Sequence, residues 1–427
     1  MLQSTLERVV LDQQEEMRDF LGDSSICHRK EEEWIDLDSR LAQVVIGVRR
    51  SGKSTLCMNA LHAAGVYYAY VNFDDERLFD MTAADFDLLL ECLYKIYAEF
   101  THLFLDEVQN INGWHLFVNR MLRKGMRVIV TGSNSRLLST ELATHLTGRH
   151  HVIELFPFSF YDFCNYKKVQ ISPLTTLNRG LLQRAFDDYL HQGGFPELMR
   201  EKDARSYLSS LLHSIVTQDI QRRFSIRNTD TLLRLVNHLL NIAPTIVVRK
   251  KLMEIFGINS AHTIGNYLSY LSHTYLLSYV SKYSTKSRLR ATGEKAYAID
   301  VAFMSERPDT MVGDNIGWRM EAIVYLELRR RSTMVSQDVY YYIESGSEAD
   351  FVVCDGNKAE SVYQVTYSLE SARTRKREVC GAVAAVKATY ARHAYIITYN
   401  ETETIEQKGV TIQVIPIWQW LTEKWDG

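Results

Sequence analysis

Three absences limit what this chain can be. Its six cysteines show no C-x-x-C spacing, which argues against a zinc site and against a disulfide scaffold, so we expect reduced thiols. The sequence also lacks any apolar run of about 18 residues, and acidic residues interrupt the apolar pattern of residues 1–20. These features are not those of a transmembrane helix or a signal peptide, so we expect a cytoplasmic protein that does not bind membranes.

A strong excess of charge of one sign is also absent. The chain has 49 Lys and Arg against 52 Asp and Glu, a net charge of −3. This balance gives no general attraction to nucleic acid, so any contact with DNA or RNA must depend on local basic patches. With 427 residues, of which 46% are hydrophobic and 24% charged, the chain is long enough for two or three domains with separate cores.

The most informative stretch is residues 47–55, GVRRSGKST, which fits the pattern G-x-x-x-x-G-K-[ST] and follows the apolar residues 44–46. Gly47 and Gly52 allow the backbone to curl until successive N–H groups face one anion at the start of a helix. Lys53 adds a positive charge for the β- and γ-phosphates, and Ser54 adds a hydroxyl for Mg²⁺. The sequence therefore predicts a site for ATP and Mg²⁺ in an α/β P-loop domain. The predicted nucleotide-binding residues are Gly47, Arg50, Ser51, Gly52, Lys53, Ser54 and Thr55.

Two carboxylates, Asp106 and Glu107, follow an apolar strand predicted at residues 101–105. In an open parallel sheet, ligands bind beyond the carboxyl ends of the strands, where the glycine loop also lies. We therefore predict that Asp106 binds Mg²⁺ together with Ser54, and that Glu107 polarises the water that attacks the γ-phosphate. The alternative is a solvated acidic turn without a catalytic role.

Further polar residues are candidates near the γ-phosphate. A strand predicted at residues 127–132 should lie between the first and third strands, which brings Ser133 or Asn134 to the water or the phosphate; a loop-capping turn is the alternative. Arg149 follows a glycine at the edge of the domain, and it is either an arginine finger toward a neighbouring subunit of a homo-oligomer or an ordinary surface arginine. The catalytic candidates are therefore Glu107, Asn134 and Arg149.

Several segments together resemble a known family. They are GVRRSGKST (47–55), FLDEVQNINGW (104–114), VIVTGSNSRLL (128–138), LTGR (146–149), LFPFSFYDF (155–163) and GGFPEL (193–198). In order and spacing they are similar to prokaryotic AAA-type P-loop ATPases that carry a C-terminal PD-(D/E)XK-nuclease-like domain. The resemblance implies a nucleotide-dependent ATPase in which the loop lysine, the loop serine and the acidic pair have the roles described above. It implies no particular cellular task, because the group is defined mainly by its fold.

The segments that flank the nucleotide domain show mainly helical patterns. Residues 3–21 predict a leading helix that packs on the nucleotide domain, and Arg29 after it either approaches the nucleotide or faces solvent. From residue 230, three helices followed by two pairing strands predict a winged-helix segment. This segment either contacts DNA or RNA phosphates or is purely structural. Its flanking basic residues are Arg249, Lys250, Lys251, Lys282, Lys286, Arg288 and Arg290.

The C-terminal part predicts a smaller α/β domain. A nuclease of this kind needs two or three carboxylates to bind Mg²⁺ and a lysine to activate the attacking water. By the resemblance, Glu321 on a helix and Asp350 on a strand align with the first two acids. Gln364 and Thr366 stand where an acid and a lysine are expected, so we expect weak metal binding and slow cleavage at a degenerate site formed by Glu321, Asp350 and Gln364. A nearby basic group that suits a phosphate backbone is Arg373, Arg375, Lys376 and Arg377.

These features predict an α/β protein in four parts. They are an AAA-type ATP-binding domain with its leading helix (1–165), a helical lid (166–229), a winged-helix-like segment (230–305) and a nuclease-like domain (315–427). The predicted function is a Mg²⁺-dependent ATPase that couples nucleotide hydrolysis to domain rearrangement on DNA or RNA. Two alternatives remain open: an ATP-gated nuclease, and a slow nucleotide-switched regulator that acts through protein partners.

Overall fold

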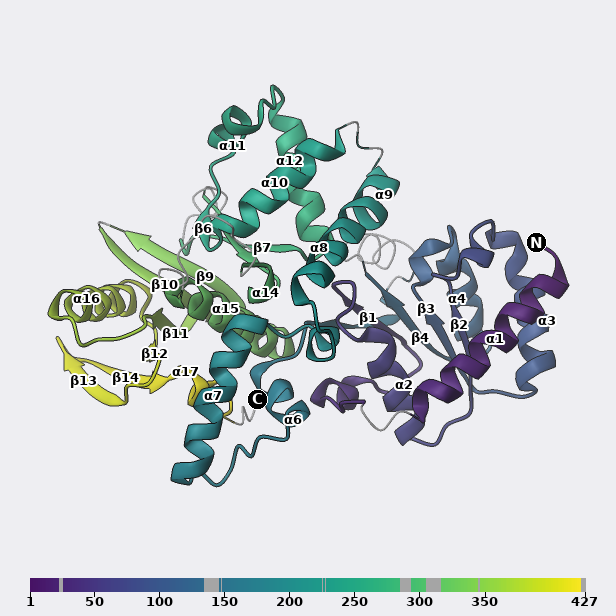
Figure 1. Ribbon diagram of the computed structural model, residues 1–427, viewed down its shortest axis with the longest axis horizontal. Helices are drawn as coiled ribbons and strands as arrows, with labels where there is room; N and C mark the ends of the chain where they lie inside the picture. Colours follow the sequence, from purple (N-terminus) through teal and green to yellow (C-terminus); the bar gives the residue numbers. More distant parts are fainter. Residues whose placement is uncertain are drawn as a thin grey trace. The chain divides into compact units, whose positions relative to one another are not determined.

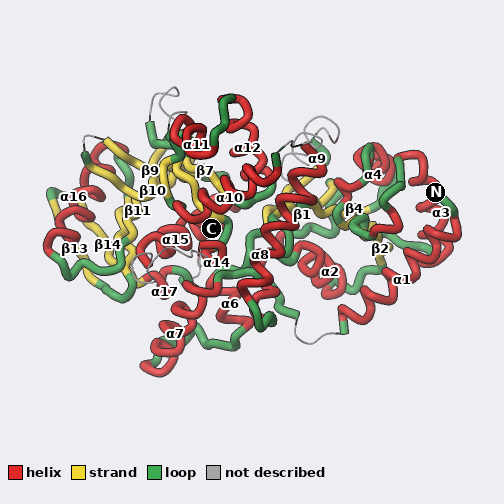
Figure 2. The backbone as a smooth tube through the Cα atoms, turned by 45° about the horizontal axis from the view of Figure 1, so that its top comes forward, coloured by secondary structure: helices red, strands yellow, loops and turns green. Residues whose placement is uncertain are grey.

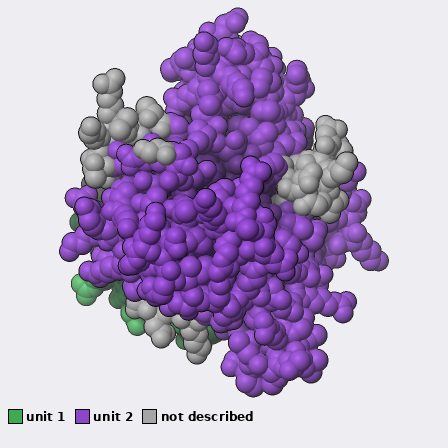
Figure 3. All heavy atoms as spheres, turned by 90° about the vertical axis from the view of Figure 1, so that its left-hand side faces the viewer, with its two compact units in different colours: residues 1–155, 273–275 green, residues 156–272, 276–427 purple. Residues whose placement is uncertain are grey.

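The computed structural model describes the chain in two compact units. The described residues are 1–22, 26–133, 146, 148–224, 226, 228–284, 293–304, 316–344 and 346–423. Unit 1 comprises residues 1–155 with 273–275, and unit 2 comprises residues 156–272 with 276–427 (Figure 3). Four residues with a predicted role lie outside the described residues: Asn134, Lys286, Arg288 and Arg290. The finer division into four parts remains a prediction.

Unit 1 is built on a five-stranded parallel sheet with the order β2-β3-β4-β1-β5 (Figure 1). Its strands are β1 (Ala42–Gly47), β2 (Tyr68–Asn72), β3 (His102–Asp106), β4 (Arg127–Gly132) and β5 (His150–Leu155). Its α-helices are α1 (Gln3–Leu21), α2 (Lys53–Ala63), α3 (Phe86–Tyr97) and α4 (Trp114–Arg123). Strands β1 to β4 are almost continuously buried, as expected for a parallel sheet covered on both faces, whereas the edge strand β5 is partly exposed. The predicted strands are confirmed, and β4 lies between β3 and β1 as predicted.

The leading helix α1 belongs to this unit. Its apolar face buries Leu6, Val9 and Val10. The side chain of Gln13 donates to the carbonyl of Asn72 at 3.0 Å and accepts from the N–H of Asn72 at 3.0 Å. These two hydrogen bonds attach α1 to the end of β2, so the prediction that this helix packs on the nucleotide domain is confirmed.

Unit 2 begins with a helical region followed by a small antiparallel sheet. Its first helices are α6 (Phe160–Tyr166), α7 (Thr176–Gln192), α8 (Ala204–Ser214), α9 (Arg222–Phe224), α10 (Thr229–Ile242), α11 (Arg249–Phe256) and α12 (Ala261–His273). Strands β6 (Thr245–Ile246), β7 (Leu277–Val280) and β8 (Lys295–Ala298) form a sheet in the order β6-β8-β7. The predicted pairing of β7 with β8 is confirmed. The two-residue strand β6 was not predicted, because so short a segment carries no alternating pattern.

A larger mixed sheet forms the rest of unit 2, with the order β13-β14-β12-β11-β10-β9 (Figure 1). Figure 2 shows its strands in yellow, with helix α16 beside them in red. Its strands are β9 (Asp338–Glu344), β10 (Ser347–Asp355), β11 (Lys358–Val365), β12 (His393–Thr398), β13 (Glu403–Gln407) and β14 (Val410–Pro416). Its helices are α14 (Val301–Met304), α15 (Ile316–Val335), α16 (Ala372–Thr389) and α17 (Ile417–Trp420). The chain order α15, β9, β10, β11, α16, β12 places three antiparallel strands beside a parallel one. Within the described part of the chain, no helix is both long and apolar enough to cross a bilayer.

The turn at Gly193 and Gly194 fixes the end of α7 by close backbone approach. The N–H of Gly194 donates to Asp300 Oδ2 at 2.8 Å, and its carbonyl accepts from the N–H of Phe158 at 2.7 Å. A Cβ atom at Gly194 would lie 2.2 Å from the carbonyl oxygen of Phe158, which is far inside van der Waals contact. Glycine is therefore required at this position.

We expect Gly194→Ala to destabilise the protein by more than about 3 kcal/mol, since the backbone at Phe158, in the loop between β5 and α6, has to move away. The matched control is Gly180→Ala within α7, where an added Cβ meets no atom within 4 Å. Alanine in an open helical position stabilises by about 0.5–1 kcal/mol. Thermal unfolding followed by circular dichroism measures both changes. Equal midpoints for the two variants would contradict the assigned packing.

Candidate functional site

The loop between β1 and α2 has the curled backbone that the glycine pattern predicted. Gly52 has φ 92° and ψ 25°, a left-handed conformation directly before Lys53 begins α2. Arg50 is also left-handed, with φ 68°. A Cβ atom at Gly47 would lie 2.1 Å from the carbonyl oxygen of Leu155 at the end of β5. The two pattern glycines are therefore required by different constraints, conformation at Gly52 and close approach at Gly47.

Lys53 lies beside the acidic pair Asp106 and Glu107 at the end of β3. Its side chain is 4% exposed, and Nζ donates to the carbonyl of Val48 at 3.2 Å. The same Nζ lies 3.5 Å from Glu107 Oε1. The loop lysine and the acids at residues 106 and 107 therefore meet in one place, although about fifty residues of chain separate them.

Asp106 is buried and surrounded by hydroxyl donors. Its carboxylate accepts from Thr131 Oγ1, from Tyr70 OH at 3.3 Å and from the hydroxyl of Ser54. Burial raises the pKa of Asp106, the nearby Glu107 carboxylate raises it further, and the hydrogen bonds from Thr131 and Ser54 oppose both effects. A bound cation favours the ionised form of such a carboxyl group. The contact between Ser54 and Asp106, two of the oxygen ligands that Mg²⁺ prefers, fits the predicted metal site.

Glu107 is held in a rare backbone conformation. It has φ 49° and ψ 42°, and its N–H donates to Thr131 Oγ1 at 2.9 Å. Its carboxylate accepts a short hydrogen bond from the amide of Gln109, in addition to the ion pair with Lys53. A left-handed non-glycine residue is energetically costly and is found preferentially at functional sites.

Two residues of this site were not found from the sequence. Thr131 contacts both members of the acidic pair, and Gln109 contacts Glu107 and lies 3.5 Å from the hydroxyl of Ser133. Ser133, one of the two predicted residues at the end of β4, is buried near this network, whereas Asn134 lies outside the described residues. Thr131 could have been found from its position near the carboxyl end of β4, because a strand predicted between β1 and β3 brings that end close to both of them.

The two candidate arginines differ in their environment. Arg29 is buried, donates to the carbonyl of Ser51 at 3.3 Å and pairs with Glu31 at 2.9 Å. The solvent-exposed alternative for Arg29 is therefore wrong, because its guanidinium supports the loop backbone. Arg149 is exposed, and its backbone carbonyl accepts from the N–H of Ala42 at 3.0 Å. Its side chain is thus held at the start of β5, at the edge of the sheet.

Comparison with known proteins agrees with this geometry. Residues 39–164 match the family model described as "AAA domain", and residues 183–307 match a model described as a domain of unknown function. The chain is 31% identical to the uncharacterized protein MJ1544 of Methanocaldococcus jannaschii over 393 residues, which cover 88% of this chain and 87% of the relative. This chain belongs to the MJ1544 family. Within that family its residues 39–164 are an AAA-type P-loop domain.

Further similarities extend beyond the archaea. An uncharacterized protein of Haemophilus influenzae is 29% identical over 352 residues, which cover 78% of this chain and 84% of that protein. Among solved structures, the RuvB Holliday junction branch migration motor of Thermotoga maritima covers 64% of this chain and 93% of its own, at 16% identity and a TM-score of 0.30. The replication initiator DnaA bound to AMPPCP and single-stranded DNA covers 57% and 85%, at 13% identity and a TM-score of 0.25. Both scores are low, so the fold assignment rests on the strand order.

A second concentration of charged groups in this MJ1544-family protein lies in unit 2, around a cavity of about 910 Å³. Its charged lining residues are Lys295, Glu321, Glu348, Asp350, Glu370, Arg377 and Glu378. Glu321 on α15 and Asp350 on β10 therefore line one cavity, as the resemblance implied. Lys295 on β8 was not found from the sequence; it pairs with Glu321 at 2.7 Å and lies 3.9 Å from Asp350.

Gln364 has a defined role in the packing of this cavity. Its Oε1 accepts from the N–H of Asp350 at 2.8 Å, and its Nε2 donates to Glu378 Oε2 at 2.6 Å. The other oxygen of Glu378 accepts from Arg377 Nε at 2.9 Å. A carboxylate at position 364 would lack the N–H that reaches Glu378. Glutamine therefore fits this position, where the family pattern expects an acid.

The predicted basic groups of unit 2 are only partly available for phosphate. Arg375 makes two hydrogen bonds of 2.6 Å to Glu403, and Arg377 pairs with Glu378, so both are committed to carboxylates. The exposed members of the two predicted groups within the described residues are Arg249, Lys250, Lys251, Arg373, Lys376 and Arg377; of these, Arg249 lies 3.9 Å from Glu294 and Arg377 pairs with Glu378.

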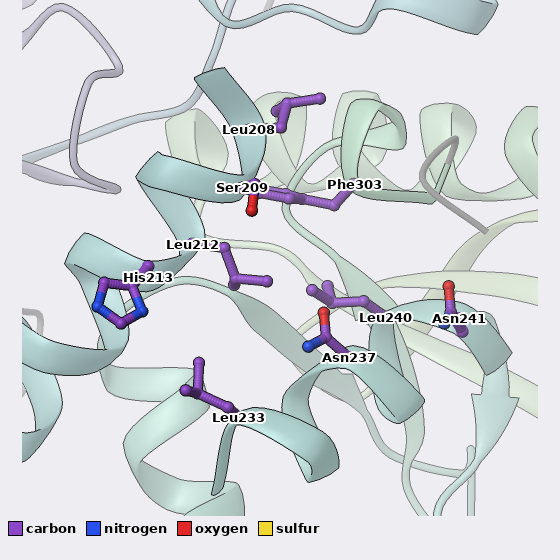
Figure 4. Close-up of a pocket in the computed structure, with 9 residues that line it drawn as sticks. All are labelled: Leu208, Ser209, Leu212, His213, Leu233, Asn237, Leu240, Asn241 and Phe303. Atoms are coloured by element: carbon purple, nitrogen blue, oxygen red, sulfur yellow. The ribbon is translucent and has the colours of Figure 1, made fainter. Parts of the chain in front are cut away.

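A separate small cavity of about 160 Å³ lies between α8 and α10 in unit 2 (Figure 4). Leucine side chains and Phe303 line it together with four polar residues, which are Ser209 and His213 from α8 and Asn237 and Asn241 from α10. It has no charged lining residue among those described, and its volume is small for a nucleotide.

Proposed function

We propose that this protein binds ATP and hydrolyses it with Mg²⁺. The observation that supports this function best is the meeting of Lys53, Ser54 and the acidic pair at the carboxyl ends of β1 and β3. A lysine and a hydroxyl that meet two carboxylates at this edge of a sheet can bind the phosphates of a nucleotide and activate a water molecule.

In this proposal the loop N–H groups and the start of α2 bind the phosphates, and Lys53 moves from the carbonyl of Val48 to the β- and γ-phosphates. Ser54 and Asp106 would hold Mg²⁺, which neutralises charge on the phosphate oxygens. Glu107 orients the attacking water and accepts its proton. Thr131, through its contacts with both acids, is a positioning residue.

We further propose that hydrolysis is coupled to rearrangement of unit 2 on nucleic acid. The order α10, β6, α11, α12, β7, β8 and the sheet order β6-β8-β7 support a winged-helix segment. Helix α12 buries Ile264 and Leu271 on one face and leaves His262 exposed on the other, with no Arg or Lys along its length. This composition favours contact with the nucleic-acid backbone through flanking groups over base-specific recognition.

We propose a nuclease-like fold for the C-terminal sheet, on the order α15, β9, β10, β11, α16, β12. The exchange of an acid and a lysine for Gln364 and Thr366 favours a binding role over cleavage. Arg149, exposed at the edge of unit 1, is proposed as an arginine finger toward a second copy of the chain.

The rate of phosphate release as a function of protein concentration, with and without DNA, tests these proposals together. We expect the specific activity to rise with protein concentration, since Arg149 completes the site of a second copy, and to rise further with DNA at low salt. The variant Arg149→Ala should lose the dependence on protein concentration, and Arg123→Ala, at the exposed end of α4, is the control. Hydrolysis that is unaffected by DNA would favour the regulator that acts through protein partners.

A further inference from the structure

The cavity of unit 2 that Glu321, Glu348 and Asp350 line also contains the ammonium group of Lys295. Lys295 reaches into it from β8, with a side chain that is 9% exposed. A lysine this deeply buried requires carboxylate partners, because the charged form is otherwise unstable away from water. Its Nζ lies 2.7 Å from Glu321 Oε1 and 3.8 Å from Glu348 Oε1. A third carboxylate oxygen, Asp350 Oδ1, lies 3.9 Å away.

We propose that the ammonium group of Lys295 occupies the place of the divalent cation that a nuclease-like domain would hold, so that this cavity binds no Mg²⁺ or Mn²⁺. The proposal goes beyond ATP hydrolysis and does not depend on it. It concerns residues of unit 2 alone, and it assigns to Lys295 the charge that a metal ion would otherwise supply.

The remaining oxygen atoms of the cluster support this assignment. Tyr297 OH donates to Glu321 Oε1 at 2.6 Å, so the oxygen nearest to Lys295 already has two partners. The N–H of Val365 donates to Asp350 Oδ2 at 2.8 Å. A divalent cation would have to displace these donors and approach an ammonium group of like charge.

The charges of the cluster follow from the same contacts. Burial lowers the pKa of Lys295, but the carboxylates of Glu321 and Asp350 raise it by more, so the pKa lies above its ordinary value. Burial and Glu321 raise the pKa of Asp350 well above its ordinary value, and Lys295 opposes this rise. The 2.7 Å contact between Lys295 Nζ and Glu321 Oε1 places the positive charge of the lysine directly against this carboxylate.

The sequence also gives a metal ion fewer ligands than the family pattern does. In the family pattern, the third position adds an acid and a lysine, whereas this chain has Gln364 and Thr366. Gln364 adds no negative charge, and the nearby acid Glu378 is neutralised by Arg377. A divalent cation would therefore find one carboxylate ligand fewer than the family pattern offers, and Glu321 already pairs with the ammonium group of Lys295.

The test counts Mn²⁺ ions bound by the full chain without nucleotide, using electron paramagnetic resonance. Four proteins are compared: wild type, Asp350→Asn, Lys295→Met, and the double variant Lys295→Met with Asp350→Asn. Any ion held at Asp106 is common to all four and cancels in the differences. We expect wild type and Asp350→Asn to bind equal numbers, Lys295→Met to bind one more ion per chain, and the double variant to lose that ion.

Two results would overturn the proposal. One is a wild-type chain that binds more Mn²⁺ than Asp350→Asn, since the cavity would then hold a metal ion beside Lys295. The other is a folded Lys295→Met variant that binds no additional ion. If Lys295→Met does not fold, as judged by circular dichroism, the comparison of wild type with Asp350→Asn decides the question alone.

Two further measurements accompany the metal count. Lys358→Met, the same change at an exposed lysine of β11, should leave the number of bound ions unchanged. DNA incubated with the wild type in Mn²⁺ should show no cleavage that Asp350→Ala removes. Cleavage that depends on Asp350 would overturn the proposal, because it requires the metal ion that Lys295 is inferred to replace.

Discussion

Lys53→Ala is expected to abolish release of phosphate from ATP, with a loss of at least about 10²–10³-fold in rate. Lys53 is a buried cation at the curled loop; its Nζ donates to the carbonyl of Val48 at 3.2 Å and lies 3.5 Å from Glu107. Without it, the γ-phosphate loses the charge that offsets its own in the transition state, and the two adjacent carboxylates lose their neighbouring cation. Release of phosphate from Mg²⁺ and ATP by the purified protein, measured by a colorimetric assay, gives the rate.

The control for this change is Lys124→Ala, the same substitution at an exposed lysine that follows α4 in the same unit. It should retain wild-type turnover. Because Lys53 is buried, circular dichroism of the variant is needed to separate loss of the site from loss of the fold. Turnover that survives in a folded Lys53→Ala protein would remove this loop from the mechanism.

Glu107→Gln is expected to preserve ATP binding and to lower turnover by about 10²–10⁴-fold, the usual contribution of a general base. The amide oxygen of glutamine can still accept a hydrogen bond from Gln109, and the loop that binds phosphate is unchanged. Binding of a fluorescent ATP analogue and release of phosphate, measured on the same preparation, separate the two effects. Equal turnover in the variant and the wild type would contradict the role of Glu107.

The same variant also has an expected pH signature. The charge of Glu107 raises the pKa of Asp106, second only to burial. Its removal lowers the pKa of Asp106, so Asp106 remains ionised at lower pH and Mg²⁺-dependent nucleotide binding should persist further into the acid range than in the wild type. Glu99→Gln, the same change at an exposed position, should shift neither turnover nor this limit.

The patterns that predicted unit 1 correctly were local. An apolar strand, a glycine loop and the start of a helix are contiguous in residues 44–55, so their conformation follows from neighbouring residues. The position of Asp106 at the end of β3 follows in the same way from one apolar run. The helix at residues 3–21 was predicted in the same way, because its apolar residues recur with the spacing of one helical face.

Contacts between distant residues account for the parts that were missed. In the sequence, Thr131 looks like any other strand residue. In the fold, β4 lies between β1 and β3, and the Thr131 hydroxyl contacts both Asp106 and Glu107. For Arg29 the sequence left an inward and an exposed position open, and the fold decided that its guanidinium contacts the carbonyl of Ser51. The two-residue strand β6 exists only because β8 offers it a pairing edge.

Sequence alone determined that this chain has an AAA-type P-loop domain and which residues form its loop and acidic pair, because these features depend on the order and spacing of residues within short segments. Only the tertiary structure decided what surrounds those residues. It placed Thr131 and Gln109 around the acidic pair, and it placed Lys295 among the carboxylates of unit 2. The physical reason is that the charge state and partners of a buried group depend on side chains that folding brings together from distant parts of the chain.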